Sequence, residues 1–107
     1  MRTRQHVQME AAADRLIARN PAWIDGGADE RWITRAVDSA TSVRVKLMPH
    51  VDGIQVQVHL PLPDDGAGNH RPDAVAWLGI VSHTLGEGYV ENLIEALVDS
   101  YVDGFYG

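Results

Sequence analysis

Apolar residues recur with a helical period near both ends of the chain. The N-terminal stripe predicts a helix over residues 4–19, which ends at Asn20-Pro21 because the residue before a proline avoids helical backbone. The C-terminal stripe predicts a long amphipathic helix over residues 88–103. The apolar positions are Met9, Ala13, Leu16 and Ile17 in the first helix and Val90, Leu93, Ile94, Leu97, Val98, Tyr101 and Phe105 in the last.

A turn followed by a second helix is predicted after the first. Asp25-Gly26-Gly27 is typical of a turn, and Asp29-Glu30 supplies the negative charge that favours a helix N-terminus. The helix is expected over residues 28–40, with a buried face made of Trp32, Ile33, Ala36, Val37 and Ala40. The three tryptophans are all expected to fill the core: Trp23, Trp32 and Trp77.

The centre of the chain alternates between apolar and polar residues on either side of Asp52-Gly53, a dipeptide typical of a two-residue hairpin turn. Folding about this turn sorts both strands into an apolar face and a polar face, which is how a register is specified. The apolar pairs are Val51 with Ile54, Pro49 with Val56, Leu47 with Val58 and Val45 with Leu60. The polar pairs are His50 with Gln55, Met48 with Gln57 and Lys46 with His59.

Residues 72–85 fit two structures. Pro72-Asp73 is a good helix start, and Ala74, Trp77, Leu78, Val81 and Leu85 then share one helical face, so a helix is preferred. The alternative is a third strand at 74–82. The predicted fold is therefore a single α+β domain over residues 1–107, with two N-terminal helices, an antiparallel β-hairpin and a long C-terminal helix packed on the sheet.

The composition narrows the chemistry. The chain has no cysteine, which excludes disulfides, thiolate metal sites and cysteine nucleophiles. It has no apolar run of membrane-spanning length, and its N-terminus lacks the apolar segment of a secretory signal, so a cytoplasmic protein is expected. Eight of the nine basic residues are arginine, which suggests a GC-rich bacterial or phage genome.

The net charge of −6 is unevenly distributed. Residues 1–50 carry eight Arg or Lys against six Asp or Glu, whereas residues 51–107 carry only Arg71 against nine acids. A net acidic chain repels phosphate, so direct binding of nucleic acid is not expected. The split favours a polarised surface that meets a basic partner on one side.

An acidic row is the first candidate site. Glu87, Glu91, Glu95, Asp99 and Asp103 recur at every fourth position of the predicted C-terminal helix. Like charges at this spacing destabilise a helix by about 0.2–0.5 kcal/mol per pair. Successive positions lie about 6 Å apart along the helix, so the row could imitate the phosphates of a nucleic acid. The alternative is a solvated face paired to Arg15 or Arg19 of the first helix.

The polar hairpin face is the second candidate. It forms a local basic and amide patch from Arg44, Lys46, His50, Gln55, Gln57 and His59. Such a patch could bind an anion, a nucleic acid phosphate or a partner's acidic surface, although two cations and two histidines are few for strong phosphate affinity. The alternative is an ordinary solvated sheet face, which is common in antiparallel sheets.

The third candidate lies in residues 59–73. Its possible metal ligands are His59, Asp64, Asp65, His70 and Asp73, which would support a small metal-dependent hydrolase. Their spacing matches no metal motif, and Pro63-Asp64-Asp65-Gly66 is typical of a turn. A solvated connector is therefore preferred, and no metal or cofactor is predicted.

No catalytic set converges, so a non-enzymatic protein-binding module is expected. It would be an inhibitor, immunity or phage anti-defence protein that occupies a basic, nucleic-acid-binding surface of a partner through the acidic C-terminal helix. No membrane contact is expected. The two alternatives are an assembly subunit that dimerises through Tyr101, Phe105 and Tyr106, and the hydrolase of residues 59–73.

Overall fold

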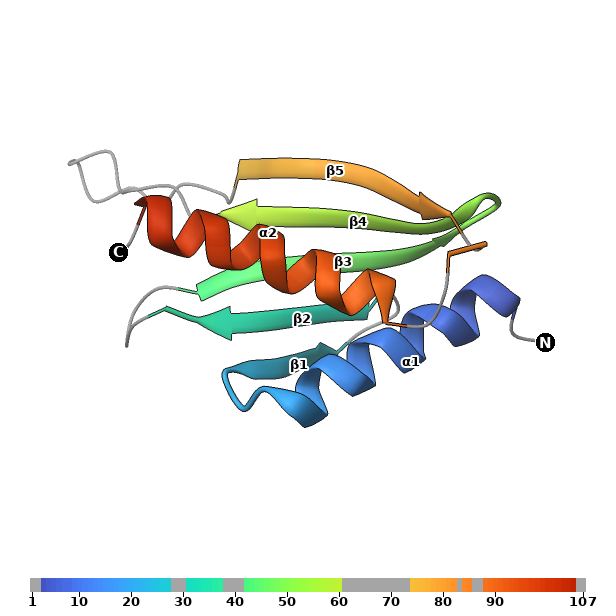
Figure 1. Ribbon diagram of the computed structural model, residues 1–107, viewed down its shortest axis with the longest axis horizontal. Coiled ribbons are helices and arrows are strands. Elements are labelled where there is room, and N and C mark those ends of the chain that lie inside the picture. Colours follow the sequence, from blue (N-terminus) through green and yellow to red (C-terminus); the bar gives the residue numbers. More distant parts are fainter. Residues whose placement is uncertain are drawn as a thin grey trace.

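The computed structural model describes residues 3–27, 31–37, 42–60, 74–82, 84–85 and 88–105. Helix α1 (Arg4–Arg19) comes first and helix α2 (Tyr89–Phe105) last. Between them lie β1 (Trp23–Gly27), β2 (Arg31–Ala36), β3 (Ser42–His50), β4 (Gly53–Leu60) and β5 (Ala74–Ser82). The strands form one antiparallel sheet in the order β1-β2-β3-β4-β5, and both helices lie on the same face of it (Figure 1).

Helix α1 confirms the prediction for residues 4–19. The side chain of Thr3 caps its N-terminus by accepting a hydrogen bond from the His6 amide at 3.0 Å. Asn20 leaves the helix with extended backbone, and its amide still donates to the Leu16 carbonyl. The buried stripe consists of Met9, Ala12, Ala13 and Leu16.

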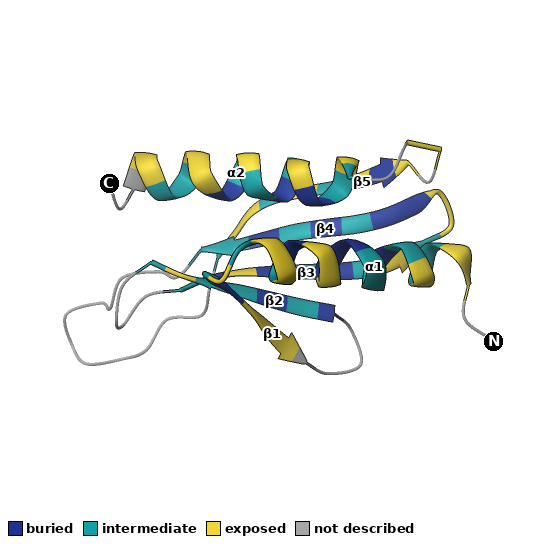
Figure 2. Ribbon diagram, turned by 60° about the horizontal axis from the view of Figure 1, so that its bottom comes forward, coloured by how far each residue is buried: buried dark blue, intermediate teal, exposed yellow. Residues whose placement is uncertain are grey.

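The core lies between the sheet and the two helices. Every second residue of β3 and β4 is buried, and these residues pack with Leu16 of α1 and with Ile94 and Val98 of α2. Buried and exposed residues alternate along both helices, as expected when one side of each helix packs on the sheet (Figure 2). The predicted packing of the C-terminal helix on the apolar hairpin face is confirmed. Within the described residues, neither helix is long and apolar enough to cross a membrane.

The predicted second helix over residues 28–40 is wrong. Residues 31–36 form β2, which pairs with β1 on one side and β3 on the other. The predicted turn Asp25-Gly26-Gly27 is the irregular end of β1. Trp32, Ile33 and Thr34 suit a strand as well as a helix, and two neighbouring strands decide between them because strand preference depends on packing. The remaining positions of the predicted helix, 28–30 and 38–40, lie outside the described residues.

The hairpin has the predicted faces, but the predicted register is wrong by two residues. The observed pairs are His50 with Gly53, Pro49 with Ile54, Leu47 with Val56 and Val45 with Val58. The turn is therefore Val51-Asp52. A shift of two keeps every side chain on its face, because the period of a strand is two. β5 explains the shift, since its pairing with β4 extends back to Gly53, opposite Ser82, and so holds this glycine in the strand.

The preferred helix over residues 72–85 is also wrong, and the alternative strand at 74–82 is present as β5. It is an edge strand and only half covered, because α2 shields one face. The ring of Trp77 lies along its own strand over Gly79, where a Cβ atom would come within 2.4 Å of it. The hydroxyl of Tyr101 in α2 donates to the carbonyl of Ala76 at 3.3 Å and so ties the helix to this edge.

A buried arginine joins α1 to the sheet. Arg31 of β2 is 9 % exposed, and its guanidinium lies among carboxylates of Glu10, Asp14 and Asp25. The Nη2–Asp14 distance is 2.9 Å and the Nε–Asp25 distance is 3.2 Å. Burial by itself lowers the pKa of Arg31, but the hydrogen bond to Asp14 and the three negative charges outweigh burial and raise it. Arg31 is therefore charged at neutral pH, like arginines in general.

Replacing Arg31 with methionine is expected to lower the free energy of unfolding by about 2 kcal/mol, because three clustered carboxylates lose their counter-charge. The carboxylates are partly exposed, so they rehydrate but still repel one another. Urea unfolding at low and high salt measures this, and added salt should restore part of the loss. Arg44→Met, on the other face of the sheet, is the matched control and should change stability by less than about 1 kcal/mol. Equal losses in the two variants would contradict the buried role of Arg31.

Candidate functional site

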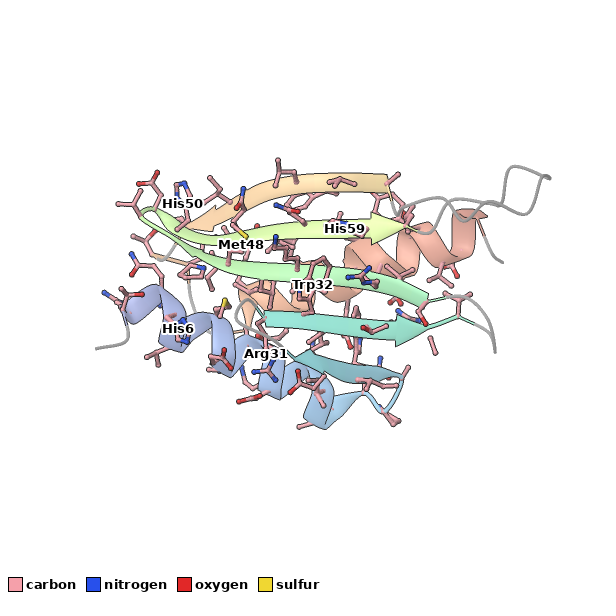
Figure 3. All side chains as sticks on the ribbon, turned by 180° about the vertical axis from the view of Figure 1, so that it is seen from behind. His6, Arg31, Trp32, Met48, His50 and His59 are labelled. Carbon is pink, nitrogen blue, oxygen red and sulfur yellow. The ribbon has the colours of Figure 1, made fainter. Side chains whose placement is uncertain are left out.

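The face of the sheet that the helices leave uncovered brings together the residues of the second candidate site. This face, called the open face below, is seen from the front in Figure 3. Its residues alternate with the core positions along each strand. Those described on it include Ile24, Trp32, Thr34, Arg44, Lys46, Met48, His50, Gln55, Gln57, His59, Val75, Leu78 and Ile80.

Trp32 lies at the centre of the open face, not in the core as predicted. The Arg44 guanidinium carbon is 4.3 Å from the centroid of its ring and the Lys46 ammonium is 5.6 Å away. The His59 ring meets it edge-on, with centroids 5.0 Å apart and planes at 62°. The four side chains come from β2, β3 and β4, and we call them the basic-aromatic patch (Figure 3).

Strand register explains why these four side chains meet. Trp32 pairs with Lys46, and Arg44 pairs with His59, so the indole ring reaches across β3 between two cations. Gln57 stands opposite Lys46, and its Oε1 lies 3.0 Å from His59 Nε2, which fixes the imidazole ring. A cation over an indole ring is stabilised by about 0.5–1 kcal/mol at exposed sites. The patch is therefore preorganised before any ligand arrives.

The open face is basic in a chain whose net charge is −6. Within the five strands the only acid is Asp25, and it is ion-paired to Arg31 on the helix-covered face. The carboxylates of α1 and α2 lie on the opposite side of the sheet. The polarised surface predicted from the charge distribution is thus organised by sheet face.

Exposed aliphatic side chains border the patch. On β5, Val75 is 52 %, Leu78 57 % and Ile80 48 % exposed. Leu78 stands opposite Gln57 and Ile80 opposite Gln55, so the aliphatic strip follows directly on the amide side chains of β4. On the far side of the patch, Ile24 of β1 is also exposed. The open face therefore combines a central cationic and aromatic cluster with apolar margins.

The acidic row is largely engaged with the chain's own arginines. Glu91 is buried and accepts two hydrogen bonds from Arg15, from Nε at 2.9 Å and from Nη2 at 3.2 Å. Glu95 accepts from Arg19 at 3.0 Å. These are the ion pairs that the alternative interpretation of the row predicts.

The other members of the row are placed as follows. Asp99 is ion-paired to Arg35 of β2, and Asp103 is exposed on the last turns of α2. Glu87 lies outside the described residues. The row therefore joins α2 to α1 and to the sheet over three of its five positions, and its exposed described members are Asp99 and Asp103.

The metal candidate cannot be assembled from described residues. Asp64, Asp65, His70 and Asp73 lie outside them, and His59 faces Trp32 on the open face. Among the residues that the structure describes, no group of three His, Asp or Glu side chains is placed to hold a metal ion. Of the C-terminal aromatics, Tyr101 bonds its own sheet, Tyr106 is not described and the side chain of Phe105 is not described.

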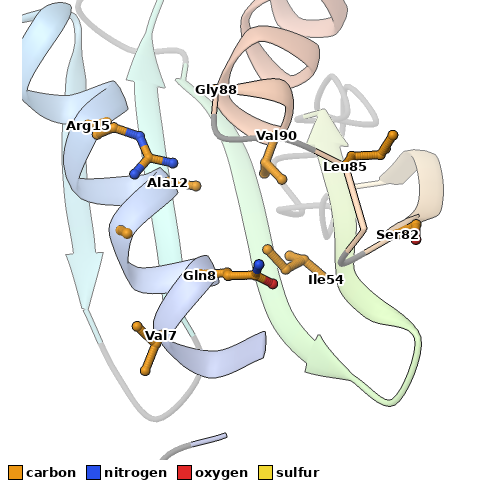
Figure 4. Close-up of a pocket in the computed structure, with 10 residues that line it drawn as sticks. Val7, Gln8, Ala12, Arg15, Ile54, Ser82, Leu85, Gly88 and Val90 are labelled. Carbon is orange, nitrogen blue, oxygen red and sulfur yellow. The ribbon is translucent and has the colours of Figure 1, made fainter. Parts of the chain in front are cut away.

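A small pocket of about 170 Å³ lies where α1, the start of α2 and the end of β5 meet (Figure 4). Its walls are mainly apolar and include Val7, Ala12, Ile54 and Val90. Arg15 forms a polar part of the wall, and its guanidinium is bonded to Glu91. The pocket thus exposes one side of the main ion pair between the helices.

The polar residues of the open face were predicted from the sequence, but Trp32 at its centre was not. Trp32 was predicted to lie in the core because the apolar residues around it also fit the spacing of a buried helix face. The alternation of a strand over residues 31–35 would have placed Trp32 correctly. In that pattern Ile33 is buried, and the side chain of Trp32 lies on the opposite face of the sheet. A comparison with family models, curated proteins and solved structures found no match to this chain.

Proposed function

We propose that this chain is a non-enzymatic protein-binding module that holds an acidic, partly apolar segment of a partner on its open face. The observation that carries the proposal is the stacking of Arg44 and Lys46 on the half-buried Trp32 ring, with His59 at its edge. Tryptophan and arginine are the residues most enriched where binding energy concentrates in protein interfaces. We propose the cytoplasm as the place of action, in keeping with a chain that has no cysteine.

Charge and shape favour an acidic protein segment as the ligand. Carboxylates of the partner would meet Arg44 and Lys46, and its apolar side chains would cover Leu78 and Ile80. A nucleic acid suits this face less well, since two full cations in a chain of net charge −6 give weak phosphate affinity. The exposed aliphatic strip of β5 also has no counterpart in a phosphate backbone.

The proposal retains the expected class of small inhibitor-like proteins but moves the contact surface. The acidic row was expected to meet a basic partner. Glu91, Glu95 and Asp99 already neutralise arginines of the same chain, so a partner would have to break those ion pairs. On the open face the cations of Arg44 and Lys46 already lie together beside the Trp32 ring. We therefore place the main contact on the open face.

The test is an NMR titration of the ¹⁵N-labelled chain with acidic amphipathic peptides built from Glu, Asp, Leu and Phe. We expect the shifts to be concentrated on β2, β3, β4 and the Trp32 indole N–H. Trp32→Ala should weaken binding by about tenfold while leaving the chain folded, because the ring is a surface anchor. Arg44→Glu should weaken it similarly and reduce its salt dependence.

Arg4→Glu on α1 is the matched control, since Arg4 is exposed on the other side of the molecule and the variant has the same net charge as Arg44→Glu. It should bind like the wild type. Shifts that map to α2, or equal losses in Arg4→Glu and Arg44→Glu, would refute the proposal. Tighter binding of single-stranded DNA than of the acidic peptides would show that the open face serves nucleic acid instead.

A further inference from the structure

The two edges of the sheet differ in how they are protected against pairing with another strand. β1 has five residues, contains Asp25 and two glycines, and has an irregular register between Asp25 and Gly27. A short strand, a charge and a bulge are devices that blunt a sheet edge. β5 has nine residues with neither a charged residue nor a proline. By the same criteria, β5 is the edge that is not protected against pairing with another strand.

The regular part of β5 runs from Trp77 to Ser82. Its pairing with β4 is irregular next to Val58, where Ala76 is the extra residue on β5. The Ala76 carbonyl already accepts from Tyr101, so the uninterrupted stretch begins at Trp77. Among the strands that the structure describes, β4 is the only neighbour of β5, and in an edge strand the N–H and C=O groups of every second residue point outward. The outward groups can form a further ladder.

We propose that a second copy of this chain pairs with β5, antiparallel, about a two-fold axis at Gly79. In this arrangement a residue that precedes Gly79 in one copy stands opposite the residue that follows Gly79 by the same number of positions in the other copy. Leu78 of each copy then lies opposite Ile80 of the other on the open face, and Trp77 lies opposite Val81 on the helix-covered face. The ladder contains about four to six backbone hydrogen bonds. The apolar pairs cover side chains that are 57 % and 48 % exposed in the single chain.

The absence of charge on β5 makes this edge suitable for a second copy. Two chains of net charge −6 repel each other, so a contact without charged side chains adds no local repulsion to self-association. β5 is such a contact, because residues 74–82 contain no ionisable side chain. The stretch is also self-complementary, because the large residues Leu78 and Ile80 would lie opposite each other on the open face, with Gly79 of the two copies nearest the axis.

The dimer differs from the one expected through the C-terminal aromatics, and it goes beyond the proposed binding of an acidic segment. It would join the two sheets into one of ten strands. The two basic-aromatic patches would then lie on one continuous face, joined by the aliphatic strips of both β5 strands. A dimeric ligand or a long acidic segment would contact both patches, which raises avidity without any new contact.

Sedimentation analysis over a range of concentrations tests the association. We expect a monomer–dimer equilibrium with a dissociation constant on the order of 10 µM, as small interfaces give weak association. Added salt should strengthen the dimer, because it screens repulsion between the two negative chains. A dimer made by basic patch against acidic helix would instead weaken with salt, and that result would overturn the proposal.

Two isoleucines on the open face provide matched variants. Ile80→Lys places a charge at the proposed interface and should abolish the dimer, whereas Ile24→Lys places it on β1 at the other edge and should leave the dimer intact. A wild type that stays monomeric at millimolar concentration, a dimer that survives Ile80→Lys, or an equal loss in both variants would overturn the proposal.

Cross-linking tests the register directly, since the chain has no cysteine of its own. Residues opposite one another in an antiparallel pair have Cα atoms about 4.5–5.5 Å apart, within disulfide range. A mixture of Leu78→Cys and Ile80→Cys chains should therefore form mixed disulfide dimers faster than either variant alone. Fastest cross-linking within Leu78→Cys alone would place the axis at another residue and overturn the pairing about Gly79.

Discussion

Replacing Arg15 with alanine is expected to lower the free energy of unfolding by about 3 kcal/mol, because it leaves a charged carboxylate buried without its partner. The side chain of Glu91 is 2 % exposed and that of Arg15 is 44 % exposed, and within the described part of the chain both hydrogen bonds to this carboxylate come from the arginine. The estimate lies at the low end for a broken buried pair. Arg15 also forms part of the pocket wall, so its removal lets water approach Glu91.

Urea unfolding measures this loss, with Arg19→Ala as the matched control on the same helix. Glu95 is 27 % exposed and also lies 3.4 Å from Asn20 Nδ2, so Arg19→Ala should be less destabilising, by about 1 kcal/mol or less. The double variant Arg15→Met, Glu91→Leu should recover most of the loss, because an apolar pair needs no counter-charge. Equal destabilisation by Arg15→Ala and Arg19→Ala would contradict the buried role assigned to Glu91.

Leu47→Ala is expected to be the most damaging truncation in the sheet, at about 3 kcal/mol. Leu47 is fully buried in the middle strand, opposite Arg31 on β2 and Val56 on β4. Alanine would leave a cavity between the sheet and the helices that the central strand cannot close by moving. For a chain of this length the loss corresponds to a fall in melting temperature on the order of 15 °C.

Leu78→Ala provides the same chemical change on an exposed site, since Leu78 is 57 % exposed on the open face. It should change the stability of the single chain by less than about 0.5 kcal/mol. Calorimetry at a concentration low enough to keep the chain monomeric makes the comparison. If Leu47→Ala cost no more than Leu78→Ala, the apolar face of the hairpin would not be the core.

The residues of the open face were only partly predictable from local sequence patterns. Its polar members on β3 and β4 were predicted from the alternation of polar and apolar residues on either side of the hairpin turn. The register error of two residues did not affect this prediction, because a shift of two leaves each side chain on the same face of the sheet. The partners brought to them by β2 and β5 were not predicted. Trp32 and Leu78 were assigned to helices, since short apolar segments satisfy both the helical and the strand period.

The acidic row shows the opposite case, in which the spacing was read correctly but its meaning depended on the rest of the fold. Helix α2 is present, and its carboxylates recur every fourth residue as the sequence indicates. Whether such a row faces solvent or a neighbouring arginine depends on what packs beside the helix. α1 and β2 supply Arg15, Arg19 and Arg35 there, and nothing within residues 88–105 could reveal that.

The sequence by itself determined the two terminal helices, the hairpin and its apolar face, because each depends on a long periodic pattern or a local turn. Only the tertiary structure decided that residues 31–36 and 74–82 are strands, where the hairpin register lies, and which face carries Trp32. Those outcomes depend on hydrogen bonds to strands distant in sequence. A strand completes its backbone pairing through its neighbours, whereas a helix completes it within itself.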